Sequence, residues 1–295
     1  MRLKDARLTI VGLGLMGGSL AGALKARQAC REVRGVARRP ETVAEALARG
    51  FIDTGTVDLP AGVQGADVVV LATPVRAIME LVPRVGPLLA PGCLLMDLGS
   101  TKAAIVKAME ALPEGVQPLG GHPVCGKEVS GIEAADQNLY REAAFVLTPL
   151  LRTSPEALAL AWELVEAVGS RPLVMDAHRH DRLLATVSHL PYLLSVGLVT
   201  TAEELAQTDG MVWDLAASGF RDTSRLAASD VRMMLDILLT NREGVVEVFG
   251  RLRERLDELG RLLESEDEQA LQPMMEAARR RRRGMFRSPG KAIFR

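Results

Sequence analysis

Short runs of β-branched and aliphatic residues alternate with helical patterns through the first 176 residues of this chain, and then the strand pattern stops. Parallel strands need a crossover between them, usually a helix, so the alternation predicts a mostly parallel sheet covered by helices. We therefore predict a doubly wound α/β domain over residues 1–176 and an all-α domain over residues 177–295. The expected strands are Leu8–Val11, Val33–Val36, Val68–Ala72, Leu94–Asp97, Val116–Leu119, Phe145–Leu147 and Pro172–Met175.

The composition limits the partners that the chain can bind. The formal net charge is −1 and aromatic residues make up 3% of the chain, so it offers neither a general attraction for polyanions nor aromatic platforms for bases. We therefore expect no nucleic-acid partner. The cysteines Cys30, Cys93 and Cys125 are odd in number and widely spaced, which is typical of a compartment where thiols stay reduced and favours the cytoplasm.

Neither a signal peptide nor a membrane span is expected. Residues Met1–Thr9 enter a predicted strand without the apolar region of a signal peptide. The most apolar later stretch, Pro191–Val199, is interrupted by Gly197 and followed by Glu203 and Glu204. No run is therefore expected to be long enough to cross a bilayer.

A glycine-rich turn, Gly12-Leu13-Gly14-Leu15-Met16-Gly17, directly follows the first predicted strand and opens a helical pattern. In the dinucleotide-binding fingerprint, the first glycine permits a tight turn, the second lets the backbone approach a pyrophosphate, and the third lets the helix pack on the strand. A glycine-rich turn alone would be a weak signal, but the strand before it and the helix after it favour a cofactor site. We therefore predict a Rossmann domain that binds a nicotinamide dinucleotide at residues 12–17.

The position about twenty residues further on tests which dinucleotide is bound, because NAD enzymes place a carboxylate there against the ribose 2′-hydroxyl. This chain has Ala37, Arg38 and Arg39 at that position. Two guanidinium groups can form charge-assisted hydrogen bonds with a 2′-phosphate, so Arg38 and Arg39 favour NADP, with NAD possible. The alternative is that both arginines are solvated residues ahead of a helix that starts at Pro40.

Ligands of open parallel sheets bind outside the carboxyl ends of the strands, and polar residues stand at three of the predicted ends. Thr73 follows one strand and is held extended by Pro74, Ser100 follows the next, and His122 the one after. Ser100 could also cap a helix over residues 101–112, and a single histidine is often structural. Their convergence on one edge nevertheless favours His122 as a site residue, while Ser100 could serve both purposes.

The helical half contains one periodic apolar seam, formed by Val245, Phe249, Leu252, Leu256, Leu259 and Leu263. Such a narrow seam needs a partner helix, either within the domain or across a subunit interface. The run Arg279–Arg283 is interpreted as a solvated charge run rather than an anion site. The pair His178 and His180 has a metal-like spacing but no accompanying carboxylate or cysteine cluster, so a solvated or capping role is expected and no metal site is predicted.

Five motifs, in this order, resemble those of the prephenate and arogenate dehydrogenases of tyrosine biosynthesis, over about residues 7 to 270. They are the glycine fingerprint, Leu98–Lys102, Gly121–Glu128, Ser188–Pro191 and Gly219–Arg225. The resemblance implies a two-domain homodimer, joined through the helical domain, that removes hydride and carbon dioxide from prephenate or arogenate.

The resemblance also implies roles for individual residues. His122 would accept the proton of the substrate hydroxyl, and Ser100 would orient that hydroxyl or His122. The substrate-binding residues would be Arg225, which can clamp a carboxylate, together with His189, Asp222 and Gly126. A free Asp222 carboxylate would favour arogenate, which carries an ammonium group, whereas one occupied by Arg221 or Arg225 would not.

Two other functions remain open from the sequence. A dehydrogenase of small β-hydroxy acids also joins a Rossmann domain to a helical one, but it would need a catalytic lysine, and residues 177–240 contain none. A dinucleotide-sensing protein without turnover would bind NADP, and substitution of His122 would change nothing measurable.

Overall fold

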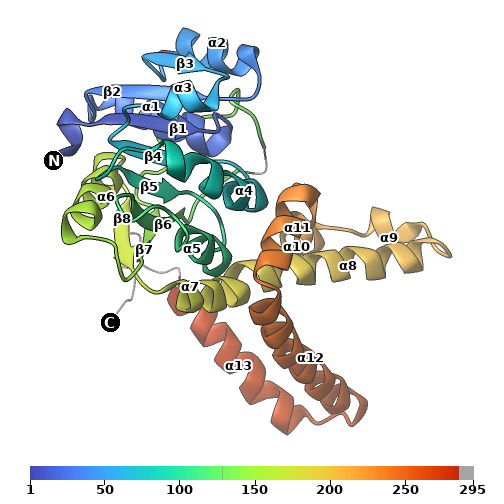
Figure 1. Cartoon of the computed structure of the whole chain (residues 1–295). Coiled ribbons are helices and arrows are strands. Elements are labelled where there is room, and N and C mark those ends of the chain that lie inside the picture. The colour runs from blue at the N-terminus through green and yellow to red at the C-terminus, as the bar shows by residue number, and fades with distance from the viewer. Residues whose placement is uncertain (128, 286–295) are drawn as a thin grey trace. The chain divides into compact units, whose positions relative to one another are not determined.

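The computed structural model describes residues 1–127 and 129–285, so Glu128 and residues 286–295 lie outside the description. By its internal contacts the chain divides into two compact units, residues 1–245 and residues 246–295. The first unit is built on an eight-stranded sheet with the order β3-β2-β1-β4-β5-β6-β7-β8 (Figure 1). Its strands are β1 (Arg7–Val11), β2 (Glu32–Val36), β3 (Thr54–Thr56), β4 (Val68–Leu71), β5 (Leu94–Asp97), β6 (Gln117–Pro123), β7 (Ala144–Pro149) and β8 (Arg171–Val174).

The sheet is parallel except where β6 pairs antiparallel with β7. Each of the seven predicted strands is present, and the predicted doubly wound, mostly parallel α/β fold is confirmed. The sequence reading missed β3, whose three residues include Gly55 and are half-buried or exposed. A strand this short, at the sheet edge, has no apolar run by which to recognise it.

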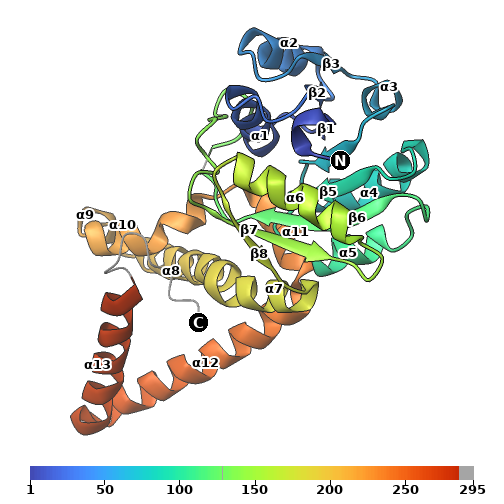
Figure 2. The ribbon, with the colours of Figure 1, turned by 90° about the vertical axis from the view of Figure 1, so that its left-hand side faces the viewer.

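Helices cover both faces of the sheet (Figures 1 and 2). Apolar residues of α1 (Leu15–Ala26), α2 (Pro40–Ala48) and α6 (Pro155–Ala167) pack against one face. Those of α3 (Leu59–Val63), α4 (Val75–Val85) and α5 (Ala103–Met109) pack against the other. Because both faces are covered, the central strands β4 and β5 are buried along their whole length, as parallel strands usually are.

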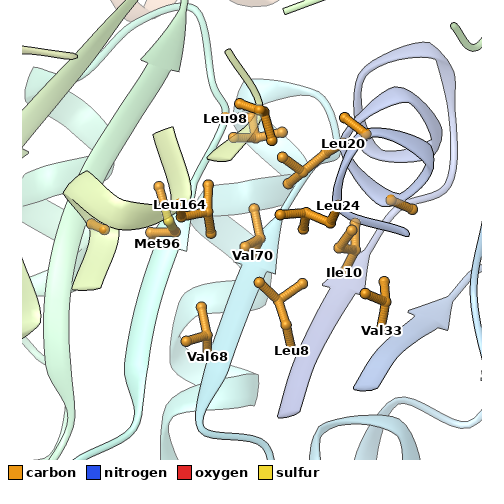
Figure 3. Packing of buried hydrophobic residues seen from close by; sticks show 14 of the residues in the cluster. Leu8, Ile10, Leu20, Leu24, Val33, Val68, Val70, Met96, Leu98 and Leu164 are labelled. Atoms are coloured by element: carbon orange, nitrogen blue, oxygen red, sulfur yellow. The ribbon is translucent and has the colours of Figure 1, made fainter. Parts of the chain in front are cut away.

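The larger core lies between β1, β4, β5 and the helices α1 and α6. Figure 3 shows Leu8 and Ile10 of β1 directed toward Leu20 and Leu24 of α1, and all four side chains are fully buried. Leu164 of α6 joins the same cluster. This packing fixes α1 against β1 and so sets the position of the glycine-rich turn between them.

The rest of the first unit is helical. The helices are α7 (Ala177–Leu184), the π-helical turn η3 (Ala185–His189), α8 (Leu190–Ala206), α9 (Met211–Asp214), α10 (Ser218–Ser224), the short 3-10 helix η4 (Arg225–Ala228) and α11 (Val231–Thr240). Asp176 caps α7 by accepting a hydrogen bond from the backbone nitrogen of Arg179 at 2.8 Å. Both α10 and η4 pack on α8 (Figure 1).

One stretch of the described residues, Ala177–Ala206, is long and apolar enough to cross a membrane by length and composition, a result that the sequence reading did not expect. The same test is passed by core helices of other proteins. Here the buried face of the stretch carries His180, Asp181 and His189, which are hydrogen-bonded to other parts of the first unit. That face therefore packs on protein.

The second unit contains most of α12 (Arg242–Glu264) and all of α13 (Glu268–Met285). Three members of the predicted seam, Phe249, Leu256 and Leu263, are exposed in the single chain. The predicted domain boundary at residue 176 lies just after the last strand, whereas the compact units divide at residue 245. The division at 176 into a sheet-containing and a helical domain therefore stays a prediction.

Candidate active site

The glycine-rich turn leaves β1 at Gly12, whose φ of +103° favours glycine. A Cβ atom at this position would lie 2.7 Å from the carbonyl oxygen of Ala72, and one at Gly17 would overlap the carbonyl oxygen of Gly12. At Gly14, by contrast, a Cβ would meet no atom within 4 Å. The first and third glycines are therefore required by the packing of the chain itself, and the second faces open space at the start of α1.

The first turn of α1 leaves its backbone N–H groups available to a ligand. Gly14 is the N-cap and provides no side-chain cap, and Leu15 and Met16 follow it in the helix. Such a helix end attracts anions such as a pyrophosphate. Leu13 is only 2% exposed and packs in the core, so it can contribute to this site only through its backbone.

Thr73 and Pro74 follow β4, next to the turn. The hydroxyl oxygen of Thr73 is buried and has no hydrogen-bond partner among the residues that the structure describes, and an unpaired buried hydroxyl is costly unless a ligand completes it. Pro74 is the N-cap of α4. The open space at Gly14, the uncapped helix and the unpaired Thr73 hydroxyl together fit a dinucleotide.

Arg38 and Arg39 follow the end of β2, beside the same turn. The backbone nitrogen of Gly12 donates to the carbonyl oxygen of Val36, two residues before Arg38, at 2.8 Å. Both arginines are exposed, Arg39 is the N-cap of α2, and neither forms an ion pair with a described residue. Their role in the choice between NADP and NAD stays a prediction.

His122 lies within a strand, so the prediction that it follows the end of one is wrong. The predicted end of this strand at Leu119 is the end of its pairing with β5, but β6 continues to Pro123 because it pairs antiparallel with β7, where His122 is opposite Val146. This extension holds the backbone of His122 in a sheet. The residue is 8% exposed.

His122 forms a chain of hydrogen bonds with α7. Its Nδ1 is 2.8 Å from Nε2 of His180, and Nδ1 of His180 is 2.7 Å from a carboxylate oxygen of Asp181. That carboxylate also accepts hydrogen bonds from the backbone nitrogens of Lys102 at 2.7 Å and Ala103 at 2.9 Å. The expectation of a solvated or capping role for His180 is therefore wrong, because the residue is fully buried.

A buried ion pair supports the loop that carries Ser100 and the strand that carries His122. The carboxylate of Asp97, at the end of β5, bonds to the ammonium group of Lys102 and accepts from the backbone nitrogens of Gly99 at 2.7 Å and Gly121 at 3.0 Å. Burial raises the pKa of Asp97 and lowers the pKa of Lys102, while their mutual attraction opposes both shifts. The pair ties together the residues immediately before Ser100 and His122.

Ser100 itself is half-buried in the loop between β5 and α5. The expected helix start at residue 101 is wrong: α5 begins at Ala103 and its N-cap is Lys102, without a side-chain cap. The carboxylate of Asp181 accepts from the first backbone N–H groups of this helix instead. Ser100 therefore does not cap this helix.

Burial lowers the pKa of His122 well below its usual value, and the nearby His180, Lys102 and His189 lower it further. The imidazole therefore stays neutral at neutral pH. Its Nε2 has no hydrogen-bond partner within residues 1–127 and 129–285. The site thus holds a neutral imidazole with one nitrogen bonded to the protein and the other available.

His189 lies at the end of the π-helical turn η3 and is 1% exposed. Its Nδ1 is 3.2 Å from the amide nitrogen of Asn241, which also donates to the carbonyl oxygen of Asp181 at 2.7 Å. Burial lowers the pKa of His189 to about 4. Asn241 therefore links His189 to the helix that carries His180 and Asp181.

The remaining predicted substrate residues are exposed. Arg225 begins η4, and its neighbour Leu226 packs with Tyr192 of α8. Asp222 is on α10 and lies 3.5 Å from Arg221 as an ion pair. Gly126 is exposed in the loop after β6. The structure thus assembles the histidine cluster, and the predicted substrate-binding roles of Arg225, Asp222 and Gly126 stay predictions.

His180 and Asp181 are the residues that sequence reasoning missed, although a signal was available. Ala177, His180, Asp181 and Leu184 recur at the spacing of one helical face, and all four are buried. A histidine and an aspartate on the buried face of a helix need polar partners.

In the described part of the chain no group of three or more histidine, cysteine or acidic side chains is arranged to hold a metal ion.

Comparison with known proteins gives consistent matches. Residues 20–174 match the family described as "Prephenate dehydrogenase, nucleotide-binding domain", and residues 176–277 match "Prephenate dehydrogenase, dimerization domain". A prephenate dehydrogenase from Lactococcus lactis subsp. cremoris is 36% identical over 282 residues, which are 95% of this chain and 77% of that protein.

Solved structures agree with these matches. A prephenate dehydrogenase from A. aeolicus, in complex with hydroxyphenyl propionate and NAD+, superposes with a TM-score of 0.89 at 31% identity and covers 95% of this chain and 98% of its own. The arogenate dehydrogenase from Synechocystis gives a TM-score of 0.81 at 31% identity, with 94% of this chain and 99% of its own covered.

Proposed function

This chain belongs to the prephenate dehydrogenase family, and from that premise we propose that it oxidises and decarboxylates prephenate or arogenate with NADP. The substrate of this reaction loses hydride from the ring carbon that carries the hydroxyl group and carbon dioxide from the opposite carbon, and the ring becomes aromatic. The bound dinucleotide supplies the hydride acceptor. The backbone at Gly12, Gly14 and Gly17 and the hydroxyl of Thr73 would hold it.

His122 is the proposed base. A neutral imidazole whose Nδ1 is bonded to His180 can receive a proton at Nε2. It takes the hydroxyl proton as hydride leaves and returns that proton to the ring oxygen once loss of carbon dioxide has made the ring aromatic. No net proton is consumed, so the imidazole is regenerated in each turnover.

The other side chains would bind and orient the substrate. Ser100 would hydrogen-bond the reacting hydroxyl or His122, a role compatible with its half-buried position. Arg225 would clamp a substrate carboxylate with its planar guanidinium group. His189, whose Nδ1 is bonded to Asn241, would face the substrate with its other edge, and Gly126 and Asp222 would line the entrance.

Both substrates stay within the proposal. Arg221 occupies the carboxylate of Asp222 at 3.5 Å, an arrangement that favours prephenate over the ammonium group of arogenate. Both side chains are highly exposed, however, and such a pair contributes at most about 1 kcal/mol. An ammonium group could therefore displace Arg221 at little cost, so the choice is left to the assay.

We also propose a cytoplasmic homodimer joined through the helical domain, with residue 176 as the functional domain boundary. The match to a dimerization domain at residues 176–277 supports it. Apolar side chains left exposed on α8 and α12, among them Leu194, Leu205 and Leu256, supply surface for a partner helix. In this dimer, a second copy of the chain, rather than lipid, would bury the exposed apolar side chains of the stretch Ala177–Ala206.

The observation that carries the proposed function is the buried, neutral imidazole of His122 on the sheet edge that also bears the glycine-rich turn. Steady-state assays with prephenate and arogenate, each with NADP and with NAD, test it. We expect turnover of at least one substrate, with NADP preferred. If dinucleotide binds but neither cyclohexadiene is turned over, the chain is a dinucleotide-sensing protein and the proposal is wrong.

A further inference from the structure

The hydrogen bonds behind His122 have a direction that can be worked out from their far end. A carboxylate only accepts hydrogen bonds, and that of Asp181 faces the backbone N–H groups of Lys102 and Ala103, which only donate. It is therefore held as an acceptor in a fixed position. Nδ1 of His180, 2.7 Å from the same carboxylate, must then carry the proton and donate it.

The same donor-to-acceptor direction extends from His180 to His122, on the reacting side of the site. When His180 carries a single proton, on Nδ1, it presents a bare Nε2 to His122, and the 2.8 Å contact then requires the proton of His122 to be on Nδ1. Nε2 of His122 is left with its lone pair, and this is the nitrogen without a partner among the described residues. Without an acceptor at Nδ1, the proton of a neutral imidazole could move to Nε2, where it would block proton transfer.

We propose that His180 and Asp181 are positioning residues that hold His122 in the tautomer with a bare Nε2 and stabilise the imidazolium that forms when it accepts a proton. The proposal rests on the proposed function, because it assigns His122 as the base. The two rings meet edge to face, at 75° with centroids 5.0 Å apart, so the contact also fixes the orientation of the His122 ring.

The surroundings make this arrangement rigid. His180 is fully buried and Asp181 is 4% exposed, so neither side chain has room to rotate into solvent. Asn241 donates to the backbone oxygen of Asp181 at 2.7 Å, and Asp176 caps the helix that carries both residues. Burying two polar side chains such as His180 and Asp181 costs free energy, and apolar residues would fill the same space without that cost. Packing alone therefore does not account for the pair.

Three substitutions separate positioning from folding. The O–C–N edge of a glutamine amide repeats the acceptor and donor order of the Nε2–Cε1–Nδ1 edge of His180, so His180→Gln should keep kcat within about tenfold of the wild type. His180→Leu removes the acceptor, and kcat should fall by about a hundredfold, in the range of a lost general base. His178→Leu, at an exposed position of the same helix, should change nothing.

A structural role would not give this pattern. The affinity for NADP and the KM of the substrate should stay within about threefold in all three variants, because His180 is fully buried and bonds to the Nδ1 side of His122. Positioning by His180 is excluded if His180→Leu retains kcat within about threefold of the wild type, or if His180→Gln loses as much as His180→Leu.

Nitrogen-15 NMR of histidine-labelled wild-type protein reads the tautomer directly and requires no turnover or variant. We expect His122 to show a protonated Nδ1 and a bare Nε2 at neutral pH. A proton on Nε2 of His122 would overturn the proposal even if the enzyme is active. Conversely, the expected tautomer in a protein that turns over neither substrate would reject the proposed function and leave the positioning intact.

Discussion

The glycine-rich turn and the histidine cluster lie on the same edge of one sheet, but they are built in opposite ways. The turn is made of backbone, from six consecutive residues, and its two packing glycines are required because any side chain would collide with a carbonyl group. The cluster is made of side chains, and His122 meets its partner His180 across 58 positions of sequence. A backbone site can thus be recognised from one segment, whereas a side-chain site exists only after folding.

The two regions also differ in whether their polar groups have hydrogen-bond partners within the protein. At the turn, the first backbone N–H groups of α1 have no side-chain cap, and the Thr73 hydroxyl has no partner among the described residues. Apart from Nε2 of His122, the polar groups of the cluster bond to one another, through the Asp97–Lys102 pair and the Asp181 carboxylate. We therefore expect the polar groups of the turn to find partners only when a ligand binds, and the hydrogen bonds of the cluster to be present already without a ligand. Substitutions in each region test this contrast.

His122→Asn should have the largest effect. Loss of the base should reduce kcat by about a hundredfold to ten-thousandfold, while the KM of the substrate and the affinity for NADP change by no more than a few fold. Steady-state kinetics and a dinucleotide titration measure both. Wild-type kcat in this variant would remove His122 from the reaction.

Arg225→Ala should affect substrate binding rather than chemistry. A charge-assisted hydrogen bond contributes about 1.5–3 kcal/mol, so KM should rise by about ten- to a hundredfold with a small change in kcat. The control is Arg221→Ala, four residues earlier on α10, whose exposed pair with Asp222 should matter little for prephenate. Equal effects of the two substitutions would argue against a specific clamp at Arg225.

Gly17→Ala and Gly14→Ala test the glycine-rich turn as a matched pair. The Cβ atom that the first substitution adds would overlap the carbonyl oxygen of Gly12, and such overpacking costs about 1–3 kcal/mol of the free energy of unfolding. Gly14→Ala meets nothing within 4 Å and should cost under about 1 kcal/mol, yet weaken dinucleotide binding by crowding the pyrophosphate. Chemical denaturation and titration measure the two quantities. Unchanged affinity in Gly14→Ala would place the pyrophosphate elsewhere.

Replacement of Arg38 and Arg39 by alanine tests the choice of dinucleotide. The KM for NADP should rise by about tenfold, while the KM for NAD, which lacks the 2′-phosphate, should stay the same. Kinetics with both dinucleotides give the ratio. If the ratio does not change, both arginines are solvated residues.

The pH profile should show the smallest effect. Because burial lowers the pKa of His122, the imidazole becomes protonated only at a pH below its ordinary value of about 6.5. The kcat/KM should therefore stay level as the pH falls through about 6.5 and decline only at lower pH. A decline already centred near neutral pH would contradict a buried, neutral His122.

Most of the fold could be predicted from the sequence because its signals are local. Buried parallel strands such as Val68–Leu71 form continuous apolar runs, and Gly12–Gly17 follows one of them directly. β3 could not be found, because a short edge strand carries no such run. The same holds for the true extent of β6, which depends on antiparallel pairing with β7 and not on its own residues.

The candidate site was predicted only in part, for a related reason. His122 and Ser100 are expected from the ends of neighbouring strands. His180 meets His122 only through tertiary contact, and the prediction of a solvated or capping role for it is wrong because the residue is buried. The buried face shared by Ala177, His180, Asp181 and Leu184 held the better signal. Substrate residues on α10 and η4 remain predictions because no described contact connects them with the cluster.

The structure of this protein with NADP and a hydroxyphenyl product analogue would test the central claim most directly. We predict that Nε2 of His122 lies within hydrogen-bonding distance of the ring hydroxyl, about 2.6–3.2 Å, while Nδ1 keeps its bond to His180. An imidazole directed away from the analogue, or a hydroxyl held by another side chain with His122 out of reach, would contradict the account.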